Sequence, residues 1–252
     1  RLEMERLVGR LSNRFINVPF GQVDDEITHT IEALGQFAGA DRSYVFLLSD
    51  DGAKMSNTHE WCAQGIEPQI DNLQGLPSDT FPWWMAKLRR FENVAIPRVK
   101  DLPPEASTER EILQSQDIQS LIVVPLTFAG ALIGFLGLDS VRAERIWPEE
   151  DTTSLRTLGN ALASALEHRR AEETLWQSEE RHRNVVELVG EGILMADSTE
   201  QITFANPAVE GIFGVEADGL AGRKLSEFLD PDQLAIMLNQ AELRRAGMAS
   251  SY

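Results

Sequence analysis

Apolar side chains recur at spacings of three and four residues along residues 1–39 of the chain. This spacing predicts two amphipathic helices, because it places the apolar positions on one helical face. We expect the first helix over residues 2–18, since Pro19 and the residues after it break the pattern. Asp24 is expected to cap the second helix and Gly39 to end it.

A segment rich in β-forming residues at 43–49 is followed by a second extended segment at 54–62. The turn Asp50-Asp51-Gly52 lies between them, and an Asp-Gly turn in this position predicts a β-hairpin. Together with the elements that follow, the pattern predicts an α+β fold with a mostly antiparallel sheet flanked by helices. The later elements are a helix from Pro82, a strand at 93–96, a helix from Pro104 and a second hairpin at 119–141 around Ala129-Gly130.

The stretch from Pro148 to Val189 has no proline after its first turn and one internal glycine, which predicts a single long helix. Residues beyond His168 are too strongly charged to form a core, so we expect a linker helix that pairs with a second copy of the chain. The alternative, which stays open for residues 155–165, is a terminal helix packed on its own domain. The heptad seam comprises Leu155, Leu158, Leu162, Ala165, Arg169, Glu172 and Trp176.

A second unit begins after Gly190, with two short strands in GILMAD and QITFAN. A helix follows in NPAVEGIFGV, and a last helix is expected over residues 232–245. This unit is too short to close its own core, so we expect it to be exposed, partly disordered or paired with something else. The expected domains are residues 1–168, a signalling linker helix at 169–186 and a partial domain at 187–252.

The formal net charge of −17 argues against a nucleic-acid partner and against an anionic membrane surface, since both need basic patches. No apolar run approaches the roughly 18–20 residues that span a bilayer, so no membrane insertion is expected. The single cysteine excludes an internal disulfide framework and fits a cytoplasmic location. The chain begins at Arg1 within a helical pattern, and we expect it to be a fragment of a longer protein.

His59 and Cys62, the only cysteine, lie close together in the segment NTHEWC. A strand turns successive side chains to opposite faces, so these two residues are expected to point apart. Neither a metal site nor a thiol activated by His59 is then expected, and Cys62 is expected to be a small buried residue. The predicted faces are Asn57, His59 and Trp61 on one side, and Thr58, Glu60 and Cys62 on the other.

Aromatic residues near the loops of the first domain form the candidate ligand-binding set. A pocket lined by aromatic side chains with a few polar groups is the usual form of a small-molecule site. The alternative is that each of these residues is simply part of the core. The candidates are Tyr44, Phe46, His59, Trp61, Trp83 and Trp84.

An enzyme is the competing class, with Asp139, Glu149, Glu150 and Asp151 as its acidic candidates. The alternative for these residues is a solvated helix start, where carboxylates interact favourably with the helix dipole. The sequence holds no glycine-rich phosphate loop, nucleophile elbow or metal motif. No catalytic residue is therefore expected in this chain.

Several segments in order resemble a GAF domain of bacterial multi-domain sensors over about residues 10–168. They are FAGADRSYVFLL, NTHEWCAQGI, SLIVVPLTFAGALIGFLGLDS and WPEEDTTSLRTLGNALASALE. Residues 172–252 resemble the start of a PAS domain, through SEERHRNVVELVGEGILMAD, FANPAVEGIFG and LAGRKLSEFL.

The GAF resemblance implies a small-molecule binding and dimerisation module, with an unknown ligand in a pocket over the sheet. The PAS resemblance implies a second sensory module, reached through a helix that relays the signal in a parallel homodimer. The output domain would then lie outside this chain, with a histidine kinase favoured and a diguanylate cyclase next. A ligand-free dimerisation scaffold is the alternative function, and a GAF-type enzyme ranks below it.

The resemblance also bears on cofactors. Phytochrome-like GAF domains attach a bilin through a cysteine beside a histidine, whereas Cys62 is followed by Ala63, so no bilin is expected. One cysteine is too few for the disulfide cycle of GAF-type methionine sulfoxide reductases. The PAS-like part has no cysteine for a flavin adduct, and its only nearby histidine, His182, lies in the linker, so no haem is expected.

Overall fold

The structure is a computed structural model that describes residues 2–16, 18–188, 190–216, 219–230, 232–233 and 235–236. The chain divides into two compact units, Arg1–Glu173 and Thr174–Tyr252. The boundary between them falls inside one long helix, α5 (Glu149–Leu188), which confirms the continuous helix that the sequence predicts.

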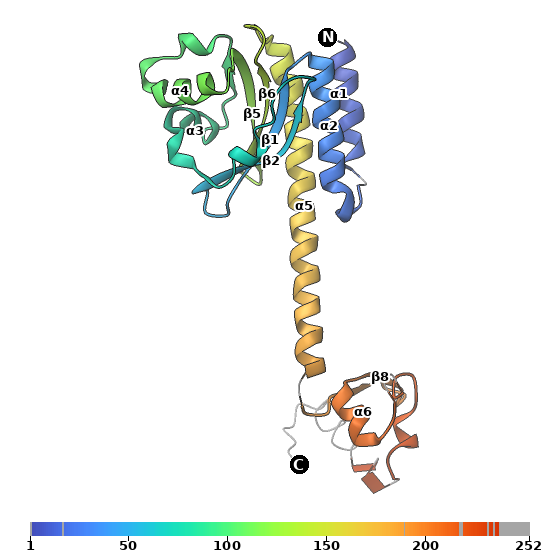
Figure 1. The fold of residues 1–252 in the computed structure, drawn as a ribbon. Coiled ribbons are helices and arrows are strands. Elements are labelled where there is room, and N and C mark those ends of the chain that lie inside the picture. The colour runs from blue at the N-terminus through green and yellow to red at the C-terminus, as the bar shows by residue number, and fades with distance from the viewer. Residues whose placement is uncertain are drawn as a thin grey trace. The chain divides into compact units, whose positions relative to one another are not determined.

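The first unit is built on a six-stranded antiparallel sheet with the strand order β3-β2-β1-β6-β5-β4 (Figure 1). Both predicted hairpins are present and lie at its centre, because β1 pairs with β2 and β5 pairs with β6. β1 also pairs with β6, which joins the two hairpins into one sheet. The strands are β1 (Arg42–Leu48), β2 (Lys54–Cys62), β3 (Leu76–Pro77), β4 (Val94–Ile96), β5 (Ser120–Phe128) and β6 (Ala131–Ser140).

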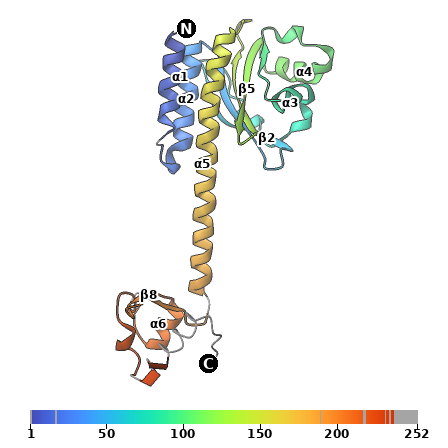
Figure 2. The ribbon, with the colours of Figure 1, turned by 180° about the vertical axis from the view of Figure 1, so that it is seen from behind.

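Three helices cover one face of this sheet: α1 (Leu2–Arg14), α2 (Val23–Ala38) and the first part of α5 (Figures 1 and 2). Ile27, Ile31 and Leu34 line the inner side of α2 and have no exposed surface, and Leu158 and Leu162 of α5 are equally buried. The apolar spacing of the sequence therefore marks the side of each helix that packs on the sheet.

The other face of the sheet carries α3 (Pro82–Leu88) and α4 (Ser107–Ser115) and forms a second apolar core (Figure 1). Pro82 and Pro104 each stand at the first turn of a helical element, as expected, although Pro104 opens a short 3-10 helix just before α4. The 3-10 helices are Phe20–Gln22, Ile70–Asn72, Ser78–Thr80, Val99–Asp101, Pro104–Ala106 and Leu225–Glu227.

Two predicted features of the N-terminal helices are wrong. α1 ends at Arg14 rather than at residue 18. Asp24 lies inside the first turn of α2 and does not cap it, because its carboxylate interacts instead with His59 and Arg169. Gly39 ends α2 as predicted, in the left-handed conformation (φ 62°) that glycine adopts without steric cost.

The early and late residues of the predicted heptad seam differ in burial. Leu155, Leu158, Leu162 and Ala165 are at most 7% exposed and pack within their own unit, which confirms a packed helix for residues 155–165. Trp176, later in the seam, is 61% exposed. A pairing of two copies through this helix can therefore use its later residues and not its first leucines.

The second unit contains a two-stranded antiparallel sheet of β7 (Leu194–Ala196) and β8 (Ile202–Ala205), followed by α6 (Pro207–Phe213). Asn206 caps α6 by accepting a hydrogen bond from the backbone N–H of Val209. The helix predicted at 232–245 lies almost wholly outside the described residues. The small core of the second unit comprises Ile202, Val209, Leu220 and Leu225.

Among the residues that the structure describes, no helix combines the length and the apolar character needed to cross a bilayer.

Candidate functional site

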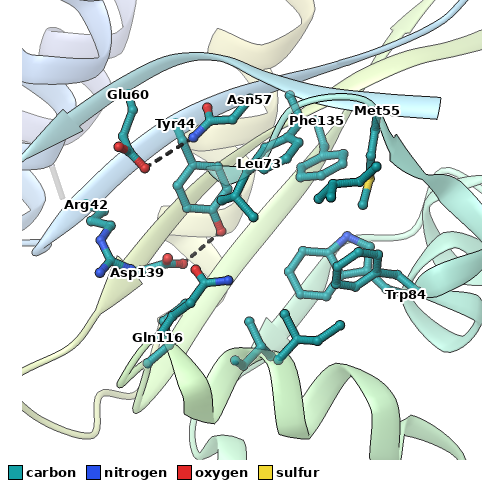
Figure 3. A pocket seen from close by; sticks show the side chains of 16 residues that line it. Arg42, Tyr44, Met55, Asn57, Glu60, Leu73, Trp84, Gln116, Phe135 and Asp139 are labelled. Atoms are coloured by element: carbon teal, nitrogen blue, oxygen red, sulfur yellow. Dashed lines mark hydrogen bonds between the residues drawn. The ribbon is translucent and has the colours of Figure 1, made fainter. Parts of the chain in front are cut away.

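A pocket lies between the sheet and the helices α3 and α4 (Figure 3). The space not filled by protein atoms measures about 550 Å³, a volume that includes open solvent at its mouth. Most of its wall is apolar and includes Phe46, Met55, Leu73, Trp84, Leu113 and Phe135. Its polar residues are Arg42, Tyr44, Asn57, Glu60, Gln116 and Asp139.

Strand alternation brings residues of β1 and β6 to the pocket. Arg42, Tyr44 and Phe46 stand two positions apart on β1, and Phe135 and Asp139 stand four apart on β6. Because side chains two or four apart in a strand share a face, all of them point to the same side of the sheet.

Stacked aromatic rings form the apolar wall. The rings of Phe46 and Phe135 are stacked with their centroids 4.8 Å apart, and Trp84 lies 5.9 Å from Phe135 at a tilt. Tyr44 meets Phe46 edge to face at 5.7 Å. Such contacts give this wall a defined shape, because aromatic pairs favour these arrangements over random packing.

Gly137 of β6 sets the position of the Tyr44 ring. A Cβ atom at Gly137 would lie 2.3 Å from that ring, so only glycine leaves room for it. The ring lies over the β6 backbone, and its hydroxyl donates a hydrogen bond of 2.8 Å to Oδ1 of Asp139.

Burial dominates the electrostatics of this pair. It raises the pKa of Asp139 to about 7, although the Tyr44 hydrogen bond and the Arg42 charge act in the opposite direction. Burial and the neighbouring Asp139 also raise the pKa of Tyr44 well above its ordinary value. Near neutral pH the tyrosine is therefore protonated, and Asp139 is close to its midpoint.

A β-bulge in β2 places Asn57 in the pocket. Val45 pairs with His59 whereas Phe46 pairs with Asn57, so Thr58 is an extra residue on its strand. The Thr58 hydroxyl donates to the carbonyl of Val45 at 3.2 Å. The predicted grouping of Asn57 with His59 and Trp61 on one face is therefore wrong, because the bulge reverses the alternation at Thr58.

Glu60 organises the loop that covers this edge of the pocket. Its Oε2 accepts hydrogen bonds from the backbone N–H groups of Gln69 (2.8 Å) and Ile70 (3.1 Å). Its Oε1 accepts one from the side-chain amide of Asn57 at 3.2 Å. Both oxygens are thus already used, and Glu60 is a structural carboxylate.

Glu109 of α4 positions Trp84. Its Oε1 accepts hydrogen bonds from the backbone N–H groups of Trp83 (2.8 Å) and Trp84 (3.2 Å) at the start of α3. These N–H groups have no partner within the helix, and no side chain of its own caps α3. A buried carboxylate from one helix therefore fixes the start of the other.

Several buried polar atoms of the pocket have no hydrogen-bond partner in the described part of the chain. They are Nε and Nη1 of Arg42, Oδ1 of Asn57 and Nε1 of Trp84. Arg42 is 4% exposed, Asn57 1% and Trp84 6%. A buried polar group without a partner costs about 1–3 kcal/mol, so a ligand that supplies partners here would be favoured.

The structure divides the six candidate ligand-binding residues. Tyr44, Phe46 and Trp84 line the pocket. His59 and Trp61 lie on the opposite face of the sheet, and Trp83 packs beside the second core without lining the pocket.

The two residues on the opposite face have structural contacts. Nε2 of His59 lies 3.1 Å from Oδ1 of Asp24, and burial lowers the pKa of the imidazole although Asp24 opposes this. Trp61 packs so closely on α2 that a Cβ at Gly35 would lie 2.5 Å from its ring. Both residues hold α2 against the sheet.

Among the polar pocket residues, sequence reasoning missed Arg42, Asn57, Glu60 and Gln116. It weighed Asp139 only as an enzyme candidate. Strand alternation could have found Arg42, which stands two positions before Tyr44. No local signal could have found Asn57, since its orientation depends on the bulge.

Cys62 is a half-buried free cysteine. Burial, followed by the neighbouring carboxylate of Glu60, raises the pKa of its thiol to about 11. The thiolate needed for nucleophilic attack is thus scarce near neutral pH. Within the described residues, no cluster of three or more His, Cys, Asp or Glu side chains could hold a metal ion.

The curled antiparallel sheet, with a helical layer on one face and a pocket on the other, is the architecture of a sensory domain. The family model of the GAF domain matches residues 22–166, and this chain belongs to that family. A PAS domain model matches residues 180–247. Both predicted resemblances and the predicted α+β class are confirmed.

Two curated relatives are similar to parts of this chain. The methanogenesis regulatory histidine kinase FilI of Methanothrix harundinacea is 33% identical over 151 residues, which cover 57% of this chain and 16% of the relative. An uncharacterized protein of Azorhizobium caulinodans is 25% identical over 168 residues, covering 67% of this chain and 22% of the relative. The chain thus spans less than a quarter of either relative.

Solved GAF domains share the fold of the first unit. The phycoerythrobilin-bound GAF domain of a cyanobacterial phytochrome has a TM-score of 0.57 at 19% identity, covering 68% of this chain and 97% of that chain. The phycocyanobilin-bound GAF domain of a cyanobacterial phytochrome has a TM-score of 0.56 at 21% identity, covering 67% and 96%. At these identities the likeness shows the fold.

These structures correct one cofactor expectation. The sequence-based exclusion of a bilin rested on Ala63 standing after Cys62, a single local motif. The domains that share this fold include bilin-binding ones, with phycoerythrobilin and phycocyanobilin among their chromophores. The expectation that excluded a bilin is therefore wrong.

Proposed function

We propose that this chain is the sensory region of a cytoplasmic signal-transduction protein. Its GAF unit binds a small organic molecule in the pocket between the sheet and α3 and α4. The helix α5 relays binding to the PAS unit and then to an output domain. A histidine kinase is the favoured output, supported by the similarity to FilI, and a diguanylate cyclase comes next.

The observation that carries the proposal is the set of unpaired polar atoms on Arg42, Asn57 and Trp84. A wall that served packing alone would use apolar side chains, because unpaired polar atoms lower the stability of the folded protein. The residues that carry these atoms line a pocket that is otherwise mostly apolar. A bound molecule with polar groups would satisfy them.

The alternative function is a ligand-free dimerisation scaffold. It is supported by the exposed apolar residues of α5, Leu175 and Trp176, which are each 61% exposed. The scaffold leaves the unpaired polar atoms of the pocket unexplained, so the sensor ranks first. A GAF-type enzyme ranks below both, since Asp139 has Tyr44 as its hydrogen-bond partner and the thiol of Cys62 is protonated near neutral pH.

The direct test is native mass spectrometry of the purified chain. We expect a bound small molecule, or stabilisation against heat by the low-molecular-weight fraction of a cell extract. In the variant Ile112→Trp, a new ring at the pocket wall is expected to abolish both effects. The control is Glu111→Trp, which adds the same ring at the neighbouring exposed position.

Two outcomes would contradict a ligand-binding pocket. One is a wild-type chain that carries no molecule and gains no stability from the extract. The other is equal loss of the bound molecule in the Ile112 and Glu111 variants, because the effect would then not come from the pocket.

A further inference from the structure

The pocket separates its polar residues from its apolar ones. Arg42, Glu60 and Asp139 gather at one end with Tyr44, while Met55 and Trp84 lie at the other (Figure 3). A molecule that fills this space must therefore be amphipathic, with an apolar body along the aromatic wall and a polar group at the opposite end.

Positive charges do not outnumber negative ones at the polar end of the pocket. Among the described residues that line the pocket, Arg42 is the single cation. It acts electrostatically on Asp139 together with Glu60 and Asp41. Asp41 is itself held by the guanidinium of Arg142 and by two backbone N–H groups. A carboxylate or phosphate placed here would lose its water beside Glu60, which repels it, and beside Asp139, which repels it in its ionised form.

The unpaired atoms define which hydrogen bonds are missing. Nε and Nη1 of Arg42 are donors, so they need an acceptor from the ligand. Oδ1 of Asn57 is an acceptor, so it needs a donor, because the amide nitrogen of Asn57 already donates to Glu60. A ligand whose polar end carries both an acceptor and a donor would supply the missing partners of these two residues.

We infer that the pocket takes an uncharged amphipathic molecule, whose apolar body lies along Phe46, Trp84 and Phe135 and whose buried polar end both accepts and donates hydrogen bonds. An amide or a lactam is the simplest such group. This inference rests on the proposed function of the pocket and names the chemical class of its ligand.

Matched pairs of probes test the charge of the polar end. Each pair shares one aromatic body and differs only between an amide and a carboxylate: phenylacetamide and phenylacetate, indole-3-acetamide and indole-3-acetate, naphthylacetamide and naphthylacetate. Titration calorimetry on the whole chain is expected to give binding at least about tenfold tighter for the amide of the best-fitting pair. The binding is expected to be lost in Ile112→Trp and kept in Glu111→Trp.

The variant Asp139→Asn gives a readout that a merely structural role would not move. It removes one of the two carboxylates that repel an anion, so it is expected to lower the ratio of amide affinity to acid affinity. A structural defect would weaken both members of a pair equally and leave this ratio unchanged.

The outcomes separate this inference from the proposed function. Tighter binding of the acids, or a co-purified ligand whose only polar group is anionic, would overturn the uncharged class and keep the pocket as a binding site. Binding of neither probe class, with no co-purified molecule, would overturn both.

Discussion

Asp139 shows at the level of one residue how burial changes chemistry. It is 3% exposed and accepts a hydrogen bond from Tyr44. Burial raises the pKa of its carboxyl from 3.8 to about 7. In the unfolded chain the group releases its proton at a lower pH than in the folded protein. Its contribution to stability is therefore present at acid pH and is lost as the pH rises through about 7.

The substitution Asp139→Asn is expected to remove this pH dependence. Between pH 5 and pH 8 the wild type should lose roughly 2–3 kcal/mol of unfolding free energy relative to the variant, by the cost of about 1.4 kcal/mol for each pKa unit. Urea unfolding of both proteins at the two pH values measures the difference. Other carboxylates titrate in both proteins, so their effects cancel. An unfolding free energy that changes equally in both would contradict a raised pKa.

At the scale of elements, three consecutive residues of β2 connect the two faces of the sheet. Asn57 lies in the pocket, and Thr58 is the bulge residue, whose hydroxyl lies 2.9 Å from Nδ1 of His59. The other ring nitrogen of His59 meets Asp24, which also pairs with Arg169 of α5. The bulge thus links a pocket residue to the helix that leaves the domain.

Replacing Asp24 with alanine is expected to loosen α5 where it passes α2. The change removes the common partner of His59 and Arg169, and we expect faster backbone hydrogen exchange near residue 169 and a stability loss of about 1 kcal/mol. Hydrogen exchange with mass spectrometry measures this. The matched control is Asp25→Ala, at the adjacent exposed position. If both variants exchange alike, the Asp24 contacts do not hold α5.

At the scale of the whole molecule, the later part of α5 carries large apolar side chains that are exposed. Leu175 and Trp176 are each 61% exposed, whereas the first leucines of the seam are buried in the GAF unit. Exposed large apolar side chains on a helix favour pairing, because association removes them from water. We propose a parallel homodimer that meets along this part of α5.

Cysteine placed at Trp176, in a Cys62→Ser background, is expected to cross-link two chains under mild oxidation. The background substitution removes the chain's only native thiol. Ser178→Cys is the matched control, since two positions along a helix turn a side chain by about 200° to the far side. Cross-linking is measured on a non-reducing gel. Equal cross-linking at both positions, or a monomer by light scattering, would count against the dimer.

Much of the fold could be predicted because its signals are local. The apolar spacing of Ile27, Ile31 and Leu34 requires only a helix, and the Asp-Gly turn at residues 51–52 requires only its own backbone conformation. The same holds for α5, whose stretch combines apolar residues at spacings of three and four with no proline after its first turn. The site was harder to predict, and only Tyr44, Phe46 and Trp84 of the six candidates line the pocket.

By itself, the sequence determined the main helices and strands, their order and the α+β class. The reason is that the spacing of apolar residues, which distinguishes a helix from a strand, is visible within a few neighbouring residues. The tertiary structure decided which face of each strand meets the pocket. Asn57 enters it because the pairing of β2 with β1 shifts at Thr58, and Tyr44 reaches Asp139 because Gly137 on another strand leaves room. The raised pKa of Asp139 likewise comes from burial by segments distant in the sequence, and no local sequence pattern predicts that burial.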